Sequence, residues 1–396
     1  MNRSVGERAG SRSPGRPSGA LVGEEGTREL SERLAQVVEW TADAVLITAL
    51  DGTIVYVNPA FETVTGYTRA EALGQTPRLL RSGHHDVPFY QSLWRTVLAG
   101  GVFRGTLVNR KKNGELFHAE HTISPIVGAD GACEYLVAIA RDITERLRNE
   151  RHEAELACGR EVQRRLYPRE APRLAGYDIA GAAHPAAFLC GDYYDFVPMA
   201  GGGLGLTIAD VCGHGVGPSI LMAQARAYLR MLALRHADAG EVLRSLNDTL
   251  TVEGSQREFV TQILVRLAPD TRTMTYANAG HPSGLLVARN GEVRRTLSSC
   301  DVPLGTFPDR AYPSSETIPL EPADVLVLFS DGYPESCNPR GEELGARRIL
   351  DVVRSHLREP APRILDAVYD AALAFRGSSP QIDDMTAIVC KLDEAS

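Results

Sequence analysis

Four aspartates lie beside apolar runs whose composition predicts β-strands, although the runs are far apart in the sequence. They are Asp210, Asp331, Asp383 and Asp384, beside the runs 204–209, 325–330 and 385–390. Carboxylates at strand ends can converge at one sheet edge, and their oxygens are ligands that suit Mg²⁺ or Mn²⁺. Two such ions can activate a water and hold a phosphate oxygen for in-line attack. The pattern therefore predicts a metal-dependent phosphohydrolase.

An upstream segment, Gly-Asp-Tyr-Tyr-Asp-Phe at 191–196, adds two carboxylates, Asp192 and Asp195. The alternative interpretation is that each aspartate only caps a turn at the end of its strand. Turn capping accounts well for any one of these residues, but it gives no reason for acidic residues in all four segments. We therefore expect a cation-binding site rather than four unrelated turns.

The composition restricts the class of protein. The chain has 396 residues, 43% of them hydrophobic, which is typical of a globular protein with two or three domains. Its net charge of −8 argues against nucleic acid or an anionic membrane as a general partner. No apolar run approaches the roughly 18 residues that a membrane span needs, and the N-terminus lacks the apolar core of a secretory signal. These features predict a cytoplasmic protein.

The pattern along the chain predicts an α+β multidomain protein with four parts. Residues 1–28 are rich in Gly, Ser and Arg and cannot bury a core, so we expect a disordered tail. Two strands, several short helices and three hairpin-linked strands predict an α+β sensor domain at 29–145. A charged helix at 146–168 leads to a larger domain at 169–394, where helices segregated from strands predict layered sheets.

The first domain resembles a PAS domain over its whole length. The motifs that carry the resemblance are Asn58-Pro59-Ala60-Phe61, Thr65-Gly66-Tyr67, Glu71-Ala72-Leu73-Gly74, Arg110-Lys111-Lys112-Asn113-Gly114 and Arg141-Asp142-Ile143-Thr144. The last of these motifs commonly ends such a domain and leads into a signalling helix. The resemblance therefore implies a sensor whose output is a helix.

The ligand of this sensor is left open by the residues. The light-sensing relatives carry a flavin-reactive cysteine, and Pro77 stands at the matching position, so cysteinyl-flavin photochemistry is excluded. Non-covalent flavin stays possible, because Arg78 and Asn109 match positions that hold flavin in those relatives. Haem is a further alternative through His84 or His85, although their Ser-Gly-His-His-Asp context favours a polar loop.

The linker predicts one amphipathic helix that ends at Pro168. Its apolar residues are spaced by four or seven positions and share one face; they are Ile143, Leu147, Ala154, Cys158, Val162 and Leu166. The face could pack against a single domain, but a coiled-coil-like pair between two copies fits better. Gly159 and the few strong apolar positions favour a weak, switchable pair. We therefore expect a homodimer through the PAS domain and this helix.

The larger domain resembles the bacterial SpoIIE branch of the PPM (PP2C-like) serine/threonine phosphatases along essentially all of residues 169–394. Its motifs, in order, are Gly191-Asp192-Tyr193-Tyr194-Asp195-Phe196, Ala209-Asp210-Val211-Cys212-Gly213-His214-Gly215, Phe259-Val260-Thr261, Asn278-Ala279-Gly280-His281-Pro282, Pro303-Leu304-Gly305, Ser330-Asp331-Gly332 and Asp383-Asp384-Met385-Thr386. The resemblance implies an α-β-β-α sandwich that binds two ions, Mn²⁺ or Mg²⁺.

The resemblance also implies roles for the matching residues. The implied metal ligands are Asp192, Asp210, Val211 through its carbonyl, Asp331, and Asp383 or Asp384. Asp210 would bridge the two ions, and motif position favours Asp383 over Asp384 without excluding either. A water between the ions would attack phosphorus directly, so no phosphoenzyme is needed. His214 would either donate a proton to the leaving serine oxygen or only order its loop.

The architecture is similar to that of bacterial stress-response phosphatases. It implies a sensor-regulated protein serine phosphatase that hydrolyses phosphoserine on a STAS-domain anti-anti-sigma factor, with the signal passing through the linker helix. Two other functions compete with this one. The intact acidic set argues against a catalytically silent scaffold, and the lack of a P-loop argues against a hydrolase of nucleotides or other small phosphoesters.

Overall fold

The computed structural model describes residues 24–213, 215–253 and 258–393. The chain divides into two compact units, with the boundary between Arg151 and His152. Each unit has its own hydrophobic core. The predicted disordered tail lies outside the described residues up to residue 23, and the first described helix begins at Glu24.

The first unit is built on a five-stranded antiparallel sheet with the strand order β2-β1-β5-β4-β3. Its elements are α1 (Glu24–Trp40), β1 (Ala44–Ala49), β2 (Ile54–Val57), α2 (Pro59–Thr65), α3 (Arg69–Ala72), the 3-10 helix η1 (Pro77–Leu80), α4 (Val87–Leu98), β3 (Phe103–Arg110), β4 (Leu116–Val127) and β5 (Cys133–Asp142). The predicted order of two strands, short helices and three hairpin-linked strands is confirmed.

Asn58 explains where helix α2 begins and how the neighbouring elements are joined. Its side-chain oxygen accepts hydrogen bonds from the N–H groups of Phe61 and Val45, at 3.0 and 2.8 Å. The first bond caps α2 and the second holds β1. Its amide nitrogen donates to the carbonyls of Val38 and Asp43, at 3.1 and 3.0 Å. The buried amide is thus satisfied on both sides by the protein itself.

Helix α5 (Thr144–Arg164) follows β5 directly. The carboxylate of Asp142 starts it by accepting hydrogen bonds from the N–H and hydroxyl of Thr144, at 2.9 and 2.6 Å. The helix ends at Arg164, short of the predicted stop at Pro168. Val162, expected on the packed apolar face, is 59% exposed, whereas the neighbouring Gln163 is buried.

The second unit contains two five-stranded sheets in its described part, with the orders β13-β10-β9-β8-β7 and β12-β11-β14-β15-β6. The strands are β6 (Tyr177–His184), β7 (Tyr193–Met199), β8 (Gly203–Val211), β9 (Val260–Ala268), β10 (Thr273–Ala279), β11 (Gly284–Val287), β12 (Val293–Leu297), β13 (Ile318–Pro319), β14 (Val325–Phe329) and β15 (Met385–Leu392). The helices are α6 (Val216–Ala233), α7 (Ala239–Glu253), α8 (Gly345–Ser355) and α9 (Ala361–Arg376). Among the described helices, none is long and apolar enough to cross a membrane.

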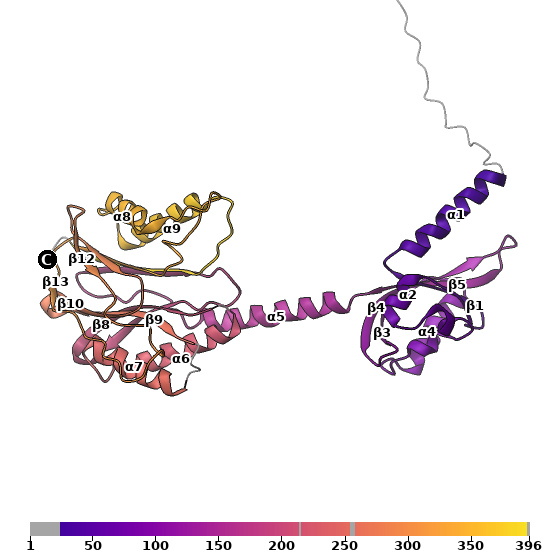
Figure 1. Cartoon of the computed structure of the whole chain (residues 1–396), viewed down its shortest axis with the longest axis horizontal. Helices are drawn as coiled ribbons and strands as arrows, with labels where there is room; N and C mark the ends of the chain where they lie inside the picture. The colour runs from indigo at the N-terminus through magenta and orange to yellow at the C-terminus, as the bar shows by residue number, and fades with distance from the viewer. Residues whose placement is uncertain (1–23, 214, 254–257, 394–396) are drawn as a thin grey trace, which may run out of the picture. The chain divides into compact units, whose positions relative to one another are not determined.

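Three apolar layers hold the second unit together, and they lie between the helices and sheets whose stacking Figure 1 shows. Helices α6 and α7 pack on the outer face of the first sheet, with Leu243 in the same cluster as Leu264. The inner faces of the two sheets meet through side chains such as Leu206 and Leu328. Helices α8 and α9 cover the second sheet, where Ile364 is buried. Each fully buried side chain of this kind contributes about 1.5–3 kcal/mol. The packing is the predicted α-β-β-α sandwich.

Candidate metal centre

One pair of acidic residues comes from the first sheet. Tyr193 pairs with Ala209, so Asp192 and Asp210 flank the same end of the paired strands β7 and β8. Asp210 itself is still within β8, and its neighbour Val211 is the last residue of the strand. The two carboxylates are therefore placed by a continuous antiparallel ladder.

The second pair comes from the second sheet. The N–H of Ser330, just after β14, donates to the carbonyl of Thr386 in β15 at 2.8 Å. This bond places Asp331 beside the segment that precedes β15. Gly332 lies so close to the carbonyl of Asp384 that a Cβ at this position would clash with it. The glycine in the Ser-Asp-Gly motif is therefore required by a close backbone approach.

The two pairs lie close together, because Gly191 is next to both: its N–H donates to Asp384 at 3.1 Å, and a Cβ on it would stand 3.5 Å from Oδ1 of Asp210. Burial, followed by the charges of Asp331 and Asp383, raises the pKa of Asp210 to about 7. Burial, followed by the charge of Asp383, raises the pKa of Asp331 to about 6. Burial, followed by the charge of Asp210, raises the pKa of Asp192 well above its usual value. Because these residues belong to different sheets, the carboxylates converge at an edge that both sheets share.

Asp192 tests whether a cation fits this edge. It is 1% exposed, and no hydrogen bond satisfies its Oδ2 among the described residues, although the hydroxyls of Ser330 and Thr386 lie near enough to favour its charged form. A buried carboxylate in such a place is costly to ionise unless a cation neutralises its charge. The carbonyl oxygen of Val211 lies next to Gly191, the residue before Asp192: a Cβ on Gly191 would stand 2.7 Å from it. Carboxylate and carbonyl oxygens form the donor set that Mg²⁺ and Mn²⁺ prefer, so the residues fit such an ion.

The acidic side chains surround the site without forming a closed cage. Within residues 24–213, 215–253 and 258–393, no three His, Cys, Asp or Glu side chains are grouped closely enough to hold an ion between them. The assignment of individual ligands therefore stays a prediction.

Asp383 and Asp384 differ in what their carboxylates already bind. The two oxygens of the buried Asp384 accept hydrogen bonds from the N–H groups of Ala186 and Gly191, at 2.7 and 3.1 Å. Asp383 is exposed, and one of its oxygens accepts from the N–H of Asp384 at 2.7 Å. Asp384 thus holds the loop before β7, whereas the charge of Asp383 acts on both Asp210 and Asp331. The choice of Asp383 as the ligand stays a prediction.

We call the edge where these carboxylates meet the acidic edge; it comprises Asp192, Asp210, Asp331, Asp383 and Asp384. Asp195, the second carboxylate of the segment 191–196, does not belong to it. Its two oxygens accept hydrogen bonds from Nη1 of Arg230, at 2.9 and 2.8 Å. The Nε of Arg226 lies 3.0 Å from one of these oxygens. Both arginines belong to α6, so Asp195 anchors that helix to β7. The sequence alone grouped Asp195 with the other acidic residues, whereas in the structure its carboxylate pairs with arginines of α6.

The turn between β8 and α6 depends on two glycines. Gly213 and Gly215 have φ angles of 90° and 97°, which residues with a Cβ rarely adopt. The backbone therefore reverses sharply after Val211, and α6 begins at Val216. His214 lies between these glycines and outside the described residues, so its role as a proton donor or a loop-ordering residue stays a prediction.

His281 lies beneath the site. Its Nδ1 is 2.9 Å from the hydroxyl oxygen of Thr261, and Thr261 pairs directly with Asp210 across β8 and β9. Burial lowers the pKa of His281 to about 3, so the ring is neutral at pH 7. A neutral, buried imidazole that supports the strand next to Asp210 favours the structural role expected for this residue.

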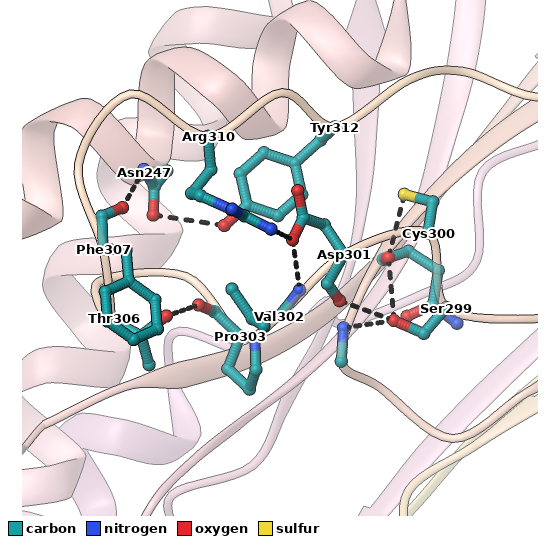
Figure 2. A network of polar contacts seen from close by, with 12 residues as sticks. Asn247, Ser299, Cys300, Asp301, Val302, Pro303, Thr306, Phe307, Arg310 and Tyr312 are labelled. Carbon is teal, nitrogen blue, oxygen red and sulfur yellow. Dashed lines mark hydrogen bonds and ion pairs between the residues drawn. The ribbon is translucent and has the colours of Figure 1, made fainter.

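A long connection between β12 and β13 runs beside the acidic edge and pairs with the start of β9. Figure 2 shows how it is pinned to helix α7. Asn247 donates a hydrogen bond to the carbonyl of Phe307 at 3.0 Å and accepts one from the N–H of Gly305 at 2.9 Å. Arg310 forms an ion pair with Asp301 across the same loop. The network fixes a rim at the site and leaves Phe307 exposed.

The residues predicted to contact a PAS ligand lie in different environments. Arg78 is exposed on η1. Asn109 is buried, and its amide nitrogen is 3.0 Å from Nε2 of His121. His85 accepts a hydrogen bond from the N–H of Val108 through its Nε2, at 2.9 Å. One ring nitrogen of His85 is thus engaged by the protein, and the flavin and haem assignments stay predictions.

Comparisons with known proteins divide the chain in the same way as its fold. Residues 200–393 match the family model described as Stage II sporulation protein E (SpoIIE), and residues 32–143 match the PAS fold. Phosphoserine phosphatase RsbU of Bacillus subtilis (strain 168) is 27% identical over 238 residues, which cover 60% of this chain and 70% of RsbU.

Two solved structures resemble the second unit. The SiaA-PP2C domain of Pseudomonas aeruginosa has a TM-score of 0.56 at 23% identity, over 62% of this chain and 98% of that one, which shows a shared fold. The RsbU and RsbW domains of Rv1364c from Mycobacterium tuberculosis have a TM-score of 0.50 at 25% identity, over 57% of this chain and 62% of that one. The predicted phosphatase fold is confirmed.

Proposed function

We propose that this chain, which is a PP2C-type protein serine phosphatase of the SpoIIE family joined to a PAS domain, hydrolyses phosphoserine on a STAS-domain anti-anti-sigma factor. The observation that carries the proposal is the convergence of carboxylates from two sheets around the unpartnered Oδ2 of Asp192. The relative RsbU is named a phosphoserine phosphatase, which supports a phosphoserine substrate. The choice of an anti-anti-sigma factor follows from the family resemblance.

The acidic edge divides into residues for two ions. Asp210 would contact both ions, and Asp192 and the carbonyl of Val211 would hold one of them. Asp331 and Asp383 would hold the other. Phosphatases of the PP2C family typically use Mg²⁺ or Mn²⁺, which when bound supplies a water of lowered pKa and positive charge against the phosphate oxygens. Burial of Asp192 and Asp210 strengthens their attraction for a cation, because little water screens their charge.

Regulation is proposed to pass through a homodimer formed by the PAS domain and α5. The helix follows the last PAS strand directly, and its last turn forms hydrogen bonds within the catalytic unit. The exposed Val162 offers an apolar side chain to a second copy of the helix. A flavin near Arg78 and Asn109, or a haem, is the candidate ligand whose binding would alter this pair.

Two alternative functions make different predictions. A silent scaffold has no need for a buried carboxylate that lacks a protein partner, so Asp192 argues against it. A hydrolase of a small phosphoester would use the same acidic edge and would prefer a free phosphomonoester to a phosphoprotein. No observation on the described residues favours the second alternative over a protein substrate.

The test is dephosphorylation of a purified phosphoserine STAS-domain protein with and without Mn²⁺. Wild type should release phosphate only with Mn²⁺, and Asp210→Asn should lose at least about 10²-fold in rate, since it removes charge shared by both ions. Asp270→Asn, which changes an exposed aspartate on the turn after β9, is the matched control. Equal turnover by wild type and Asp210→Asn would contradict the proposal, and faster turnover of a free phosphomonoester would support the small-substrate alternative.

A further inference from the structure

The last turn of α5 is bonded to the backbone that leads into the metal centre. Gln163 is 6% exposed. Its Nε2 donates to the carbonyl of Cys190 at 2.6 Å, and its Oε1 accepts from the N–H of Cys190 at 3.1 Å. One side chain of the helix thus satisfies both backbone groups of a loop residue. A buried loop backbone has few other ways to satisfy these groups, so the pairing fixes the loop in place.

Two further contacts extend the pairing in both directions along α5. The hydroxyl of Tyr167, just past the end of the helix, donates to the carbonyl of Asp192 at 2.8 Å. One turn before Gln163, Gly159 faces Leu189, and a Cβ on this glycine would stand 3.3 Å from the Leu189 side chain. Successive positions of the helix therefore contact successive residues of the loop.

The opposite side of the same loop belongs to the metal centre. The N–H of Gly191 donates to Asp384 at 3.1 Å, and the α-carbon of Gly191 packs against the carbonyl of Val211. Asp192 then directs its unpartnered Oδ2 into the acidic edge. The residues 189–192 are thus held between α5 on one side and the predicted ligands on the other. A shift of α5 has a direct bonded route to Asp192.

We propose that Gln163 and Tyr167 are positioning residues that hold the segment 189–192, here called the α5 clamp, so that Asp192 and the Val211 carbonyl can share a cation. The inference rests on the proposed function and names the contact by which the linker helix acts on it. Neither residue touches substrate or ion. Loss of the clamp should weaken metal binding more than it slows the saturated enzyme.

The test compares full-length wild type with Gln163→Met, Tyr167→Phe and Glu161→Gln. Gln163→Met keeps the length of the side chain and removes both bonds to Cys190, and Tyr167→Phe removes one hydroxyl. Glu161→Gln changes an exposed residue two positions before Gln163 and is the matched control. Mn²⁺ affinity is measured from the electron paramagnetic resonance of unbound Mn²⁺, and phosphate release is measured as a function of Mn²⁺ concentration.

The clamp predicts that Gln163→Met needs about tenfold more Mn²⁺, and Tyr167→Phe about threefold more, both for binding and for half-maximal activity. The rate at saturating Mn²⁺ should stay within about twofold of wild type, and Glu161→Gln should not differ from wild type. Unchanged Mn²⁺ affinity in both variants would overturn the proposal, as would a loss of rate that saturating Mn²⁺ does not restore. If Gln163→Met fails to fold, Tyr167→Phe decides the question.

The two proposals fail in different ways. A wild type that binds Mn²⁺ but releases no phosphate contradicts the phosphatase proposal, while the binding measurements on the variants still decide the clamp. A wild type that hydrolyses phosphoserine with Mn²⁺, together with variants of unchanged affinity, contradicts the clamp alone.

Discussion

Two regions of the catalytic unit each contain a buried aspartate from the same short segment, and the two carboxylates are neutralised differently. Asp195 faces helix α6, where Arg226 and Arg230 balance its charge. Asp192 faces the acidic edge, where its Oδ2 has no partner in the described chain and its nearest charged neighbours include Asp210. Only three positions separate the two residues, and both are 1% exposed.

The comparison distinguishes a structural carboxylate from a candidate ligand. A buried carboxylate with its own arginine partners is already neutralised by side chains of the protein. A buried carboxylate that faces further carboxylates can be neutralised only by a proton or by a cation from outside, and this property marks the candidate site. Motif membership alone did not make the distinction, because both residues stand in one Gly-Asp-Tyr-Tyr-Asp-Phe segment.

The largest expected effect is on the free energy of unfolding, when Asp195 and Asp192 are each replaced by asparagine. Asp195→Asn should lower the free energy of unfolding by about 3–5 kcal/mol, because it leaves two arginines without their buried partner. Asp192→Asn should leave stability unchanged or raise it when a chelator is present, since it removes an unbalanced charge. Thermal unfolding with chelator, repeated with Mn²⁺, measures both.

Adding Mn²⁺ to the same unfolding experiment gives a second comparison of the two variants. Wild type and Asp195→Asn should gain stability from Mn²⁺ by mass action, whereas Asp192→Asn should gain less. A loss of stability in Asp192→Asn as large as that in Asp195→Asn, in chelator, would show that Asp192 already has a partner and would contradict the comparison.

A smaller effect is expected from pH. The pKa values of Asp210 and Asp331 are raised in the fold to about 7 and about 6, above the ordinary value of 3.8. Between pH 4 and pH 7 the folded, metal-free protein therefore binds more protons than the unfolded chain, so its stability must fall as pH rises. The fall should be on the order of 2 kcal/mol after allowance for coupling between the two groups.

Denaturant unfolding at several pH values in chelator checks this sign. Asp210→Asn should flatten the profile between pH 4 and pH 7, and Mn²⁺ should reverse its slope in wild type. Metal-free stability that rises through this range would mean that the carboxylates are paired in the fold, as Asp195 is.

The smallest effect is expected at a buried polar residue that neutral partners already satisfy. Asn247 on α7 is fully buried; it bonds to the carbonyl of Phe307 (Figure 2) and to the N–H of Gly305. Asn247→Leu keeps the number and branching of the side-chain heavy atoms and should cost about 1–2 kcal/mol, because it leaves these backbone groups without a partner. Chemical denaturation measures the loss, with Asp248→Asn on the same helix as the control. Mn²⁺ affinity should not change, and a change would show that the loop acts on the metal centre.

Part of this architecture could be predicted from the sequence because its signals are local. Alternating strands, the Asn58 cap and the aspartates beside apolar runs each depend on residues close in sequence. Predicted carboxylates at strand ends also converge, because antiparallel pairing fixes which ends meet.

Other features could not be predicted because they depend on distant residues. The partners of Asp195 are more than 30 positions away on another element. Gln163 stands beside the apolar position Val162 in a charged segment, and nothing local in the sequence marks its contact with Cys190. The difference between Asp383 and Asp384 rests on backbone groups at 186 and 191, nearly 200 residues earlier. Sequence spacing carries no information of this kind.

We propose that the acidic edge of the catalytic unit binds two divalent cations through residues from both sheets. The most direct measurement is the number of Mn²⁺ ions bound per chain, obtained by titration with electron paramagnetic resonance detection, in wild type, Asp331→Asn and Asp210→Asn. We expect two bound Mn²⁺ ions per chain in wild type, one in Asp331→Asn, and weak or no binding in Asp210→Asn. Equal Mn²⁺ binding by all three proteins would contradict it.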